Sequence, residues 1–283
     1  MKKLLWIVVQ GYCANEFYYE RMIIRAEKLG LNYKVFYQEG IQIKDGEFIY
    51  NNAVVQEKPD LIYTRGLNAD LNKYFFGTGI RCVNSIFARV NCNDKIRTHK
   101  LLDKCPFVKK AKYFHKAEKC GYDEVVENVG SPFVMKARYG NGGQGVVLVN
   151  NKHEYETEIA KYEDARGVFF EEFIKTSFGK DLRVHVFGDV VAGAVIRQSA
   201  GGKDFRSNFS QGGTVREYAC PDKLKQTAVE IAKALKGEIM SVDFMFDGDD
   251  FVFCEANTEA IFVPGLGLPE ASIDYIYKVL QVN

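Results

Sequence analysis

The first part of the chain alternates between apolar runs and a segment with helical spacing. Leu4–Val9 is an unbroken apolar run, which is typical of a strand buried on both faces. Apolar positions then recur at helical spacing over Tyr18–Leu29, and this pattern ends at Gly30. Further strands are predicted at Tyr33–Tyr37 and Leu61–Thr64. Strands that alternate with helices form parallel sheets, so we predict an N-terminal α/β lobe over residues 1–92.

The pattern changes after Asn93, where a helix over residues 94–103 precedes sequence that is rich in strands. The predicted strands are Phe133–Ala137, Val146–Val149, Val168–Phe173, Asp181–Gly188, Val190–Arg197, Met240–Phe246 and Phe251–Ala256. The last four of these strands form two pairs, one separated by Gly188-Asp189 and the other by residues 247–250. These turn sequences indicate two antiparallel hairpins. A late amphipathic helix is predicted over Leu224–Leu235. We predict two further lobes, at residues 93–174 and 175–283.

Composition narrows the range of functions. The 38 basic and 37 acidic residues leave a net charge of +1, so a general surface for nucleic acid is not expected. No apolar run is long enough to span a membrane, and we read the N-terminal run as a strand rather than a signal peptide. Seven scattered cysteines without a CxxC pair disfavour zinc and predict a reducing, cytoplasmic location.

The strongest local motif is a glycine-rich segment between two predicted strands. Gly140–Gly145 satisfies the GxGxxG pattern, but the strand Val146–Val149 follows it where a dinucleotide site needs a helix. Such a loop can still bind phosphates, because glycines let backbone N–H groups approach anionic oxygens closely. Lys136, on the preceding strand, adds a positive charge. We favour phosphate binding over the alternative, a surface hairpin without a ligand.

Two acids and an amide near the C-terminus suggest a metal site. Glu255 and Asn257 are two residues apart on one predicted strand, so they share a face. Asp243 lies beside them if the predicted hairpin pairs the two strands. Three oxygen donors on one apolar sheet face suit Mg²⁺ together with nucleotide phosphates. The alternative is that the acids occupy the solvent face of a half-exposed sheet.

In combination, these motifs resemble those of the ATP-grasp superfamily, and specifically of RimK-type amino-acid ligases. The resemblance covers residues from about 93 to 260, in the segments Asn93–Lys95, Lys136–Gly145, Glu171–Ile174, Asp181–Arg183, Asp204–Asn208, Gly212-Gly213 and Glu255–Asn257. It implies a mixed α/β and α+β ATP-grasp fold, in which a Rossmann-like N-terminal lobe with a parallel sheet precedes two lobes that clamp ATP. It also implies ATP with Mg²⁺ or Mn²⁺ as cofactors.

The resemblance further implies a role for each matching residue. Lysines would contact the phosphates, Glu171–Ile174 would hold adenine largely through its backbone, and Asp181 would bind the ribose. The implied nucleotide-binding residues are Lys95, Lys136, Gly142, Gly143, Gln144, Gly145, Glu171, Glu172, Phe173, Ile174, Asp181, Phe205, Ser207 and Asn208. The implied metal ligands are Asp243, Glu255 and Asn257. Arg197 and Arg206 would be catalytic, whereas surface salt bridges are their alternative role, as they are for Arg183.

The function implied by the resemblance is an ATP-dependent carboxylate–amine ligase. It would form an amide or peptide bond through an acyl phosphate, and attach an amino acid such as glutamate to a small molecule, peptide or protein terminus. A carboxylate needs this activation because its oxygen is a poor leaving group, and positive charges stabilise the transfer. The expected partners are therefore a carboxylate and an amine, and the superfamily commonly forms homo-oligomers.

The sequence also departs from the resemblance. Similar ligases often carry Asn-Ala-Ser-Pro-Gly after the metal glutamate, whereas this chain has Asn257-Thr258-Glu259-Ala260 and reaches Pro264-Gly265 only later. The identity of the added amino acid stays open for this reason, and Arg65 is a candidate for binding a substrate carboxylate or for a structural role at the core edge. Two other functions stay open: a non-catalytic nucleotide-binding module, and a kinase that makes no amide.

Overall fold

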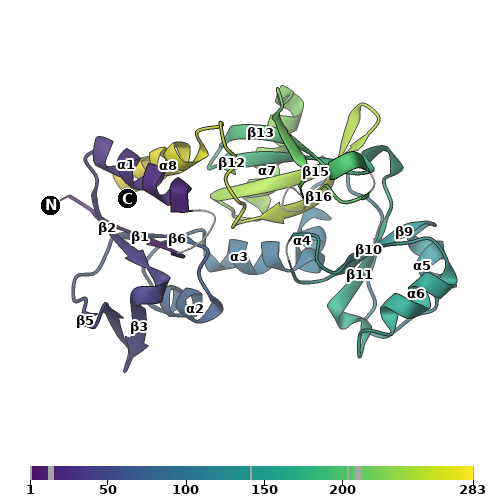
Figure 1. The fold of residues 1–283 in the computed structure, drawn as a ribbon, viewed down its shortest axis with the longest axis horizontal. Helices are drawn as coiled ribbons and strands as arrows, with labels where there is room; N and C mark the ends of the chain where they lie inside the picture. Colours follow the sequence, from purple (N-terminus) through teal and green to yellow (C-terminus); the bar gives the residue numbers. More distant parts are fainter. Residues whose placement is uncertain (1, 12–15, 141, 203, 208–211, 283) are drawn as a thin grey trace.

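The described residues fold into three lobes around four β-sheets, shown in Figure 1. The computed structural model describes residues 2–11, 16–140, 142–202, 204–207 and 212–282. The N-terminal lobe contains a parallel sheet in the order β2-β1-β6-β7. Its strands are β1 (Leu4–Val9), β2 (Asn32–Tyr37), β6 (Leu61–Arg65) and β7 (Cys82–Val83).

The unbroken apolar run of β1 is explained by cover on both faces of this sheet. Leu5, Ile7 and Val9 pack under α1 (Glu16–Lys28) and α8 (Leu268–Val282). Trp6 and Val8 face the other side, where α2 (Ala69–Gly77) and a small antiparallel sheet pack. The small sheet consists of β3 (Ile41–Lys44), β4 (Glu47–Tyr50) and β5 (Ala53–Val54).

Helix α8 joins the end of the chain to its beginning. It lies beside α1 in Figure 1, and Arg21 and Arg25 of α1 pair with Glu270 and Asp274 of α8. Residues 268–282, which the predicted division assigns to the C-terminal lobe, therefore pack on the N-terminal lobe. The boundaries at residues 92 and 174 stay a prediction.

Two consecutive helices, α3 (Ile86–Asn93) and α4 (Lys95–Leu102), lead to the central lobe. Its antiparallel sheet has the order β10-β9-β11-β8 and is covered by α5 and α6. The elements are β8 (Tyr113–Phe114), α5 (Tyr122–Val129), β9 (Phe133–Ala137), β10 (Val146–Val149), α6 (Lys152–Ile159) and β11 (Val168–Glu172).

The C-terminal lobe contains a five-stranded antiparallel sheet in the order β14-β13-β12-β15-β16. The elements are β12 (Lys180–Phe187), β13 (Val190–Gln198), β14 (Thr214–Glu217), α7 (Asp222–Ala234), β15 (Ile239–Asp247) and β16 (Asp250–Asn257). One face is apolar and packs against α7 and α4, with Leu182, Val184 and Val242 fully buried there. The opposite face is polar and belongs to the candidate site.

In the described residues, a parallel sheet and separate antiparallel sheets match the predicted mixed α/β and α+β architecture. Three predicted strands, Leu4–Val9, Phe133–Ala137 and Val146–Val149, match β1, β9 and β10 residue for residue. Both predicted hairpins are present as β12–β13 and β15–β16. Within the described residues, every helix is too short or too polar to cross a membrane.

Candidate nucleotide and metal site

A cleft between the central and C-terminal sheets brings most of the predicted site residues together. Those that line it are Lys95, Lys136, Gly143, Gln144, Glu171, Glu172, Phe173, Ile174, Asp181, Arg197, Phe205, Arg206, Ser207 and Glu255. Gly142, Gly145, Asp243 and Asn257 lie next to this lining without forming part of it. Asn208 lies outside the described residues. Residues separated by about 160 positions in sequence thus share one cavity.

The glycine-rich loop joins β9 to β10 as a tight antiparallel connection, in which Lys136 is the register partner of Val146. Gly142 and Gly145 have φ angles of +67° and +66°, which residues other than glycine rarely adopt. A Cβ on Gly145 would also lie 2.7 Å from the Cβ of Ala137. The side chain of Lys95 donates to the Gly140 carbonyl at 2.6 Å and fastens α4 to the loop.

A buried ion pair lies beneath the loop. The Lys136 ammonium group pairs with the Glu171 carboxylate, and both side chains are almost fully buried. Burial alone lowers the pKa of Lys136, but Glu171 outweighs it and raises the pKa, so this lysine is charged. The Glu171 side chain therefore binds Lys136, whereas the resemblance implies that the Glu171 backbone helps to hold adenine.

His99 supports the same ion pair from α4. Its Nε2 atom lies 3.4 Å from Glu171 Oε1, and neither that oxygen nor His99 Nδ1 has a hydrogen-bond partner among the described residues. Burial, followed by the charge of Lys136, lowers the pKa of His99 to about 3, so the ring is neutral. The Glu171 carboxylate is therefore enclosed between the charged Lys136 and the neutral His99.

The segment after β11 crosses from one lobe to the next. Glu172 is tied to Lys112 in both directions, through a backbone bond of 2.9 Å and a side-chain bond of 3.2 Å. Phe173 packs edge-on against Phe205, with ring centroids 6.2 Å apart. These two rings give the cleft an apolar wall against which a flat, uncharged ring could pack.

The polar face of the C-terminal sheet consists of three rows of side chains, because residues opposite each other in an antiparallel pair share a face. Asp181 is paired with Arg197 in the first row. Arg183, Asp243 and Glu255 form the second row. The third contains His185, Ser241 and Asn257. The rows run from the cleft toward the N-terminal lobe, whose core begins at Phe187 and Ile239.

Asp243 lies at the centre of these rows and is fully buried. Arg183 donates to its two carboxylate oxygens at 2.8 and 2.7 Å, and Arg197 donates to it at 2.8 Å. Arg197 also pairs with Asp181. Burial by itself raises the pKa of Asp243, but the two arginines outweigh it and hold the pKa far below its usual range.

Glu255 and Asn257 lie together at the edge of the cleft, as the alternation along the strand predicts. The Asn257 amide nitrogen donates to Glu255 Oε1 at 3.0 Å, which leaves the amide oxygen and the second carboxylate oxygen for other partners. In the described part of the chain, no group of three or more His, Cys, Asp or Glu side chains is placed to hold a metal. Two carboxylates and one amide fit a hard cation, provided that Asp243 releases an arginine.

Arg206 connects two loops across the cleft. It pairs with Asp204 at 2.7 Å and donates to the Gly143 carbonyl of the glycine-rich loop at 3.3 Å. It is only partly buried, so its guanidinium group remains accessible from the cleft. Arg206 therefore bridges the two loops through Asp204 and Gly143, whereas the buried Arg197 is engaged by two acids.

Comparison with known proteins identifies the family of the chain. Residues 92–266 match the model of the RimK-like ATP-grasp domain. The chain belongs to the RimK-like ATP-grasp family. It is 32% identical over 198 residues to the "Probable alpha-L-glutamate ligase" of Shewanella loihica, an alignment that covers 69% of this chain and 64% of that relative. The chain therefore spans slightly less than two thirds of that relative's length.

Solved structures show the same fold. A RimK domain ATP-grasp protein from Sphaerobacter thermophilus has a TM-score of 0.70 at 16% identity, covering 97% of this chain and 99% of that one. D-alanine–D-alanine ligase from Bacillus anthracis, solved with ATP, has a TM-score of 0.69 at 17% identity, covering 99% and 98%. The RimK-like family uses ATP, and the family and fold expected from the sequence are confirmed.

Several residues of the cleft in this RimK-like protein were not expected from the sequence. His99 supports the buried ion pair, and Lys180 and Cys254 line the cleft. Arg183, for which a surface salt bridge was one expected role, is instead largely buried and holds Asp243. The alternation along β12 places Arg183 between Asp181 and His185 on one face, and this period could have identified it.

Proposed function

We propose that this chain is an ATP-dependent ligase that joins a carboxylate to the amine of an amino acid, with glutamate as the favoured amino acid. The family match, the relative named as a glutamate ligase and the arrangement of charged groups around one cleft all support this activity. The cytoplasmic location and the homo-oligomer expected from the sequence stay predictions.

The nucleotide is proposed to lie between the glycine-rich loop and the polar sheet face. Its base fits against Phe173 and Phe205, beside the cleft-lining segment Glu171–Ile174. Its phosphates fit beneath backbone N–H groups of the loop, with the positive charges of Lys95 and Lys136 nearby. The ribose falls near Asp181, which is already paired with Arg197.

The metal is proposed to be held by Glu255 and Asn257, with Asp243 as a third ligand once it releases an arginine. Mg²⁺ or Mn²⁺ bound there would neutralise phosphate charge during transfer. The sheet holds these side chains in adjacent rows, so their backbone positions are fixed before any ligand binds.

Two steps complete the proposed reaction. A carboxylate oxygen attacks the γ-phosphorus of ATP, and ADP leaves. The amine nitrogen then attacks the carbonyl carbon of the acyl phosphate, inorganic phosphate leaves, and the nitrogen loses a proton. Arg206 is accessible from the cleft and is proposed to stabilise the negative charge of both steps, while Arg197 lines the cleft but is paired with Asp181 and Asp243.

The observation that carries this proposal is the convergence of Lys95, Lys136, Arg206 and Glu255 on one cleft. To test it, the protein is incubated with Mg-ATP, a panel of carboxylates and hydroxylamine, which traps an acyl phosphate as a hydroxamate. Replacing hydroxylamine by amino acids should then give a product mass equal to both substrates minus water, together with ADP and phosphate.

Variants on the same strand provide the control. Glu255→Gln should abolish hydroxamate formation, whereas Asp250→Asn, an exposed residue of β16, should leave it unchanged. ATP binding without hydroxamate from any carboxylate would favour a non-catalytic nucleotide-binding module. A stable phosphorylated product that resists hydroxylamine and amines would favour a kinase.

A further inference from the structure

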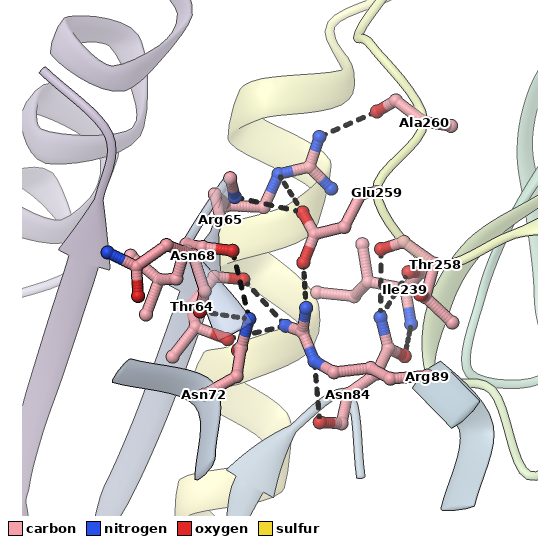
Figure 2. Close-up of polar contacts among 12 residues, drawn as sticks. Thr64, Arg65, Asn68, Asn72, Asn84, Arg89, Ile239, Thr258, Glu259 and Ala260 are labelled. Atoms are coloured by element: carbon pink, nitrogen blue, oxygen red, sulfur yellow. Dashed lines mark hydrogen bonds and ion pairs between the residues drawn. The ribbon is translucent and has the colours of Figure 1, made fainter. Parts of the chain in front are cut away.

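A polar network joins the N-terminal lobe to the segment after β16, and a carboxylate lies at its centre (Figure 2). Glu259 accepts from the backbone N–H of Gly66 at 3.1 Å and pairs with Arg89 through its other oxygen. The Nε atom of Arg65 lies 3.9 Å away. We call Arg65, Gly66 and Arg89 the carboxylate cradle.

The cradle lies where open α/β sheets bind their ligands. Arg65 is the last residue of β6, Gly66 follows it, and Arg89 reaches the same place from α3. The carboxyl end of a parallel strand is the usual ligand position in such a lobe. In this chain the position is filled by Glu259, a residue of another lobe (Figure 2).

The two arginines are held in place without Glu259. Arg65 donates to the Ala260 carbonyl at 2.6 Å and stacks on Phe262, with the guanidinium carbon 4.4 Å from the ring centre. Arg89 donates to both the carbonyl and the hydroxyl of Thr64, and to the Asn84 carbonyl at 3.3 Å. The cradle is therefore a rigid arrangement of donors.

Charge in the cradle is not balanced by Glu259 alone. The side chains of Arg65 and Arg89 are 7% and 11% exposed, and one carboxylate serves both. Buried charges are normally paired, so one positive charge in excess favours an anionic ligand. Glu259 is 32% exposed, which makes it the member of the network that can move into solvent.

The cradle also lies close to the proposed reaction centre. Glu259 follows Asn257 by two residues, and two residues of chain span at most about 7 Å. An amino acid anchored there by a carboxylate could place its amine near an acyl phosphate beside Glu255 and Asn257. A carboxylate and an amine of one amino acid are separated by a comparable or shorter distance.

We infer that the cradle binds a non-reacting carboxylate of the amino-acid substrate, and that Glu259 occupies this place until the substrate displaces it. The identity of the ligand rests on the proposed function. Glu259 then acts as a specificity residue: an amine that carries a carboxylate in reach of the cradle can replace it, whereas an amine without one gains nothing there.

Binding of L-glutamate, measured by calorimetry with Mg²⁺ and a non-hydrolysable ATP analogue, tests the inference. Glu259→Gln should bind L-glutamate about tenfold tighter than the wild type, because the competing charge is lost. Glu270→Gln, an acid of similar exposure that pairs with Arg21, should not change the affinity. Each of the two mono-amides of glutamate lacks one carboxylate. The mono-amide that lacks the carboxylate bound in the cradle should bind Glu259→Gln no more tightly than it binds the wild type. Equal or weaker binding of L-glutamate to Glu259→Gln would overturn the inference.

A second measurement does not depend on which amino acid is the substrate. In Glu259→Ala the cradle is open, so sodium acetate should raise the melting temperature by about 2 °C more than sodium chloride at equal ionic strength. Glu270→Ala should show no such difference. No acetate effect in Glu259→Ala would overturn the cradle as a carboxylate site. An acetate effect together with no glutamate binding to the wild type would support the cradle and reject glutamate as the substrate.

Discussion

Replacing Asp243 by Asn tests the most highly charged part of the polar sheet face. The substitution keeps the shape of the side chain but removes the single negative charge that Arg183 and Arg197 share within hydrogen-bonding distance. Both arginines are nearly buried, and of the two it is Arg197 that also pairs with Asp181. Removing one partner from a buried ion pair costs about 3–5 kcal/mol, because the remaining charge stays out of water.

This free energy corresponds to a measurable change in melting temperature. Unfolding entropy of about 2.1 cal/mol/K per residue gives roughly 0.6 kcal/mol/K for 283 residues, so Asp243→Asn should lower the melting temperature by about 5–8 °C. The measurement is calorimetry at pH 7 in metal-free buffer. Asp247→Asn, on the exposed end of the same strand, should leave the melting temperature unchanged. Equal melting temperatures for both variants would refute the assignment of Asp243 to a buried arginine clamp.

Three further predictions concern other parts of the site. Gly145→Ala should reduce the free energy of unfolding by about 2–4 kcal/mol, and Gly142→Ala by about 1–2 kcal/mol. Both substitutions place alanine at a positive φ, but only the Cβ at position 145 also meets a neighbouring Cβ, that of Ala137. Urea denaturation measures the difference. The pKa of His185 is lowered to about 3 by burial, so its contribution to stability is present above pH 6.5 and lost as the pH falls toward 3. His185→Phe should therefore make the dependence of unfolding free energy on pH shallower, by up to about 1.4 kcal/mol per pH unit in that window, and an unchanged slope would contradict this. Lys136→Met should weaken ATP binding at least about tenfold by calorimetry, whereas Lys109→Met, on the outer surface, should not.

The elements that the sequence predicts best are those in which local pattern and burial agree. Leu4–Val9 is apolar throughout because the sheet is covered on both faces, and its bounds are recovered. The helix α8 was missed although buried residues recur along it, including Ile273, Ile276 and Leu280. Its partner α1 is about 250 residues away, and packing between such distant segments is not encoded in the local period.

The candidate site shows the same division. Alternation along β16 places Glu255 and Asn257 on one face, and the hairpin brings Asp243 beside them, as predicted. Whether a carboxylate faces an arginine or a metal depends on which side chains approach from neighbouring strands. Arg183 and Arg197 come from β12 and β13, and only the assembled sheet places both against Asp243. The metal roles of Asp243, Glu255 and Asn257 therefore stay a proposal.

The contact between α1 and α8 has a consequence for synthesis. The ribosome releases residues 1–92 well before residues 268–282, yet the face of their sheet that α8 covers is completed only when residues 268–282 emerge. The central sheet and its helices use residues 113–172 alone, so their core is available earlier. The lobe that begins the chain is consequently the last to close, and until then Leu5, Ile7 and Val9 lack part of their cover.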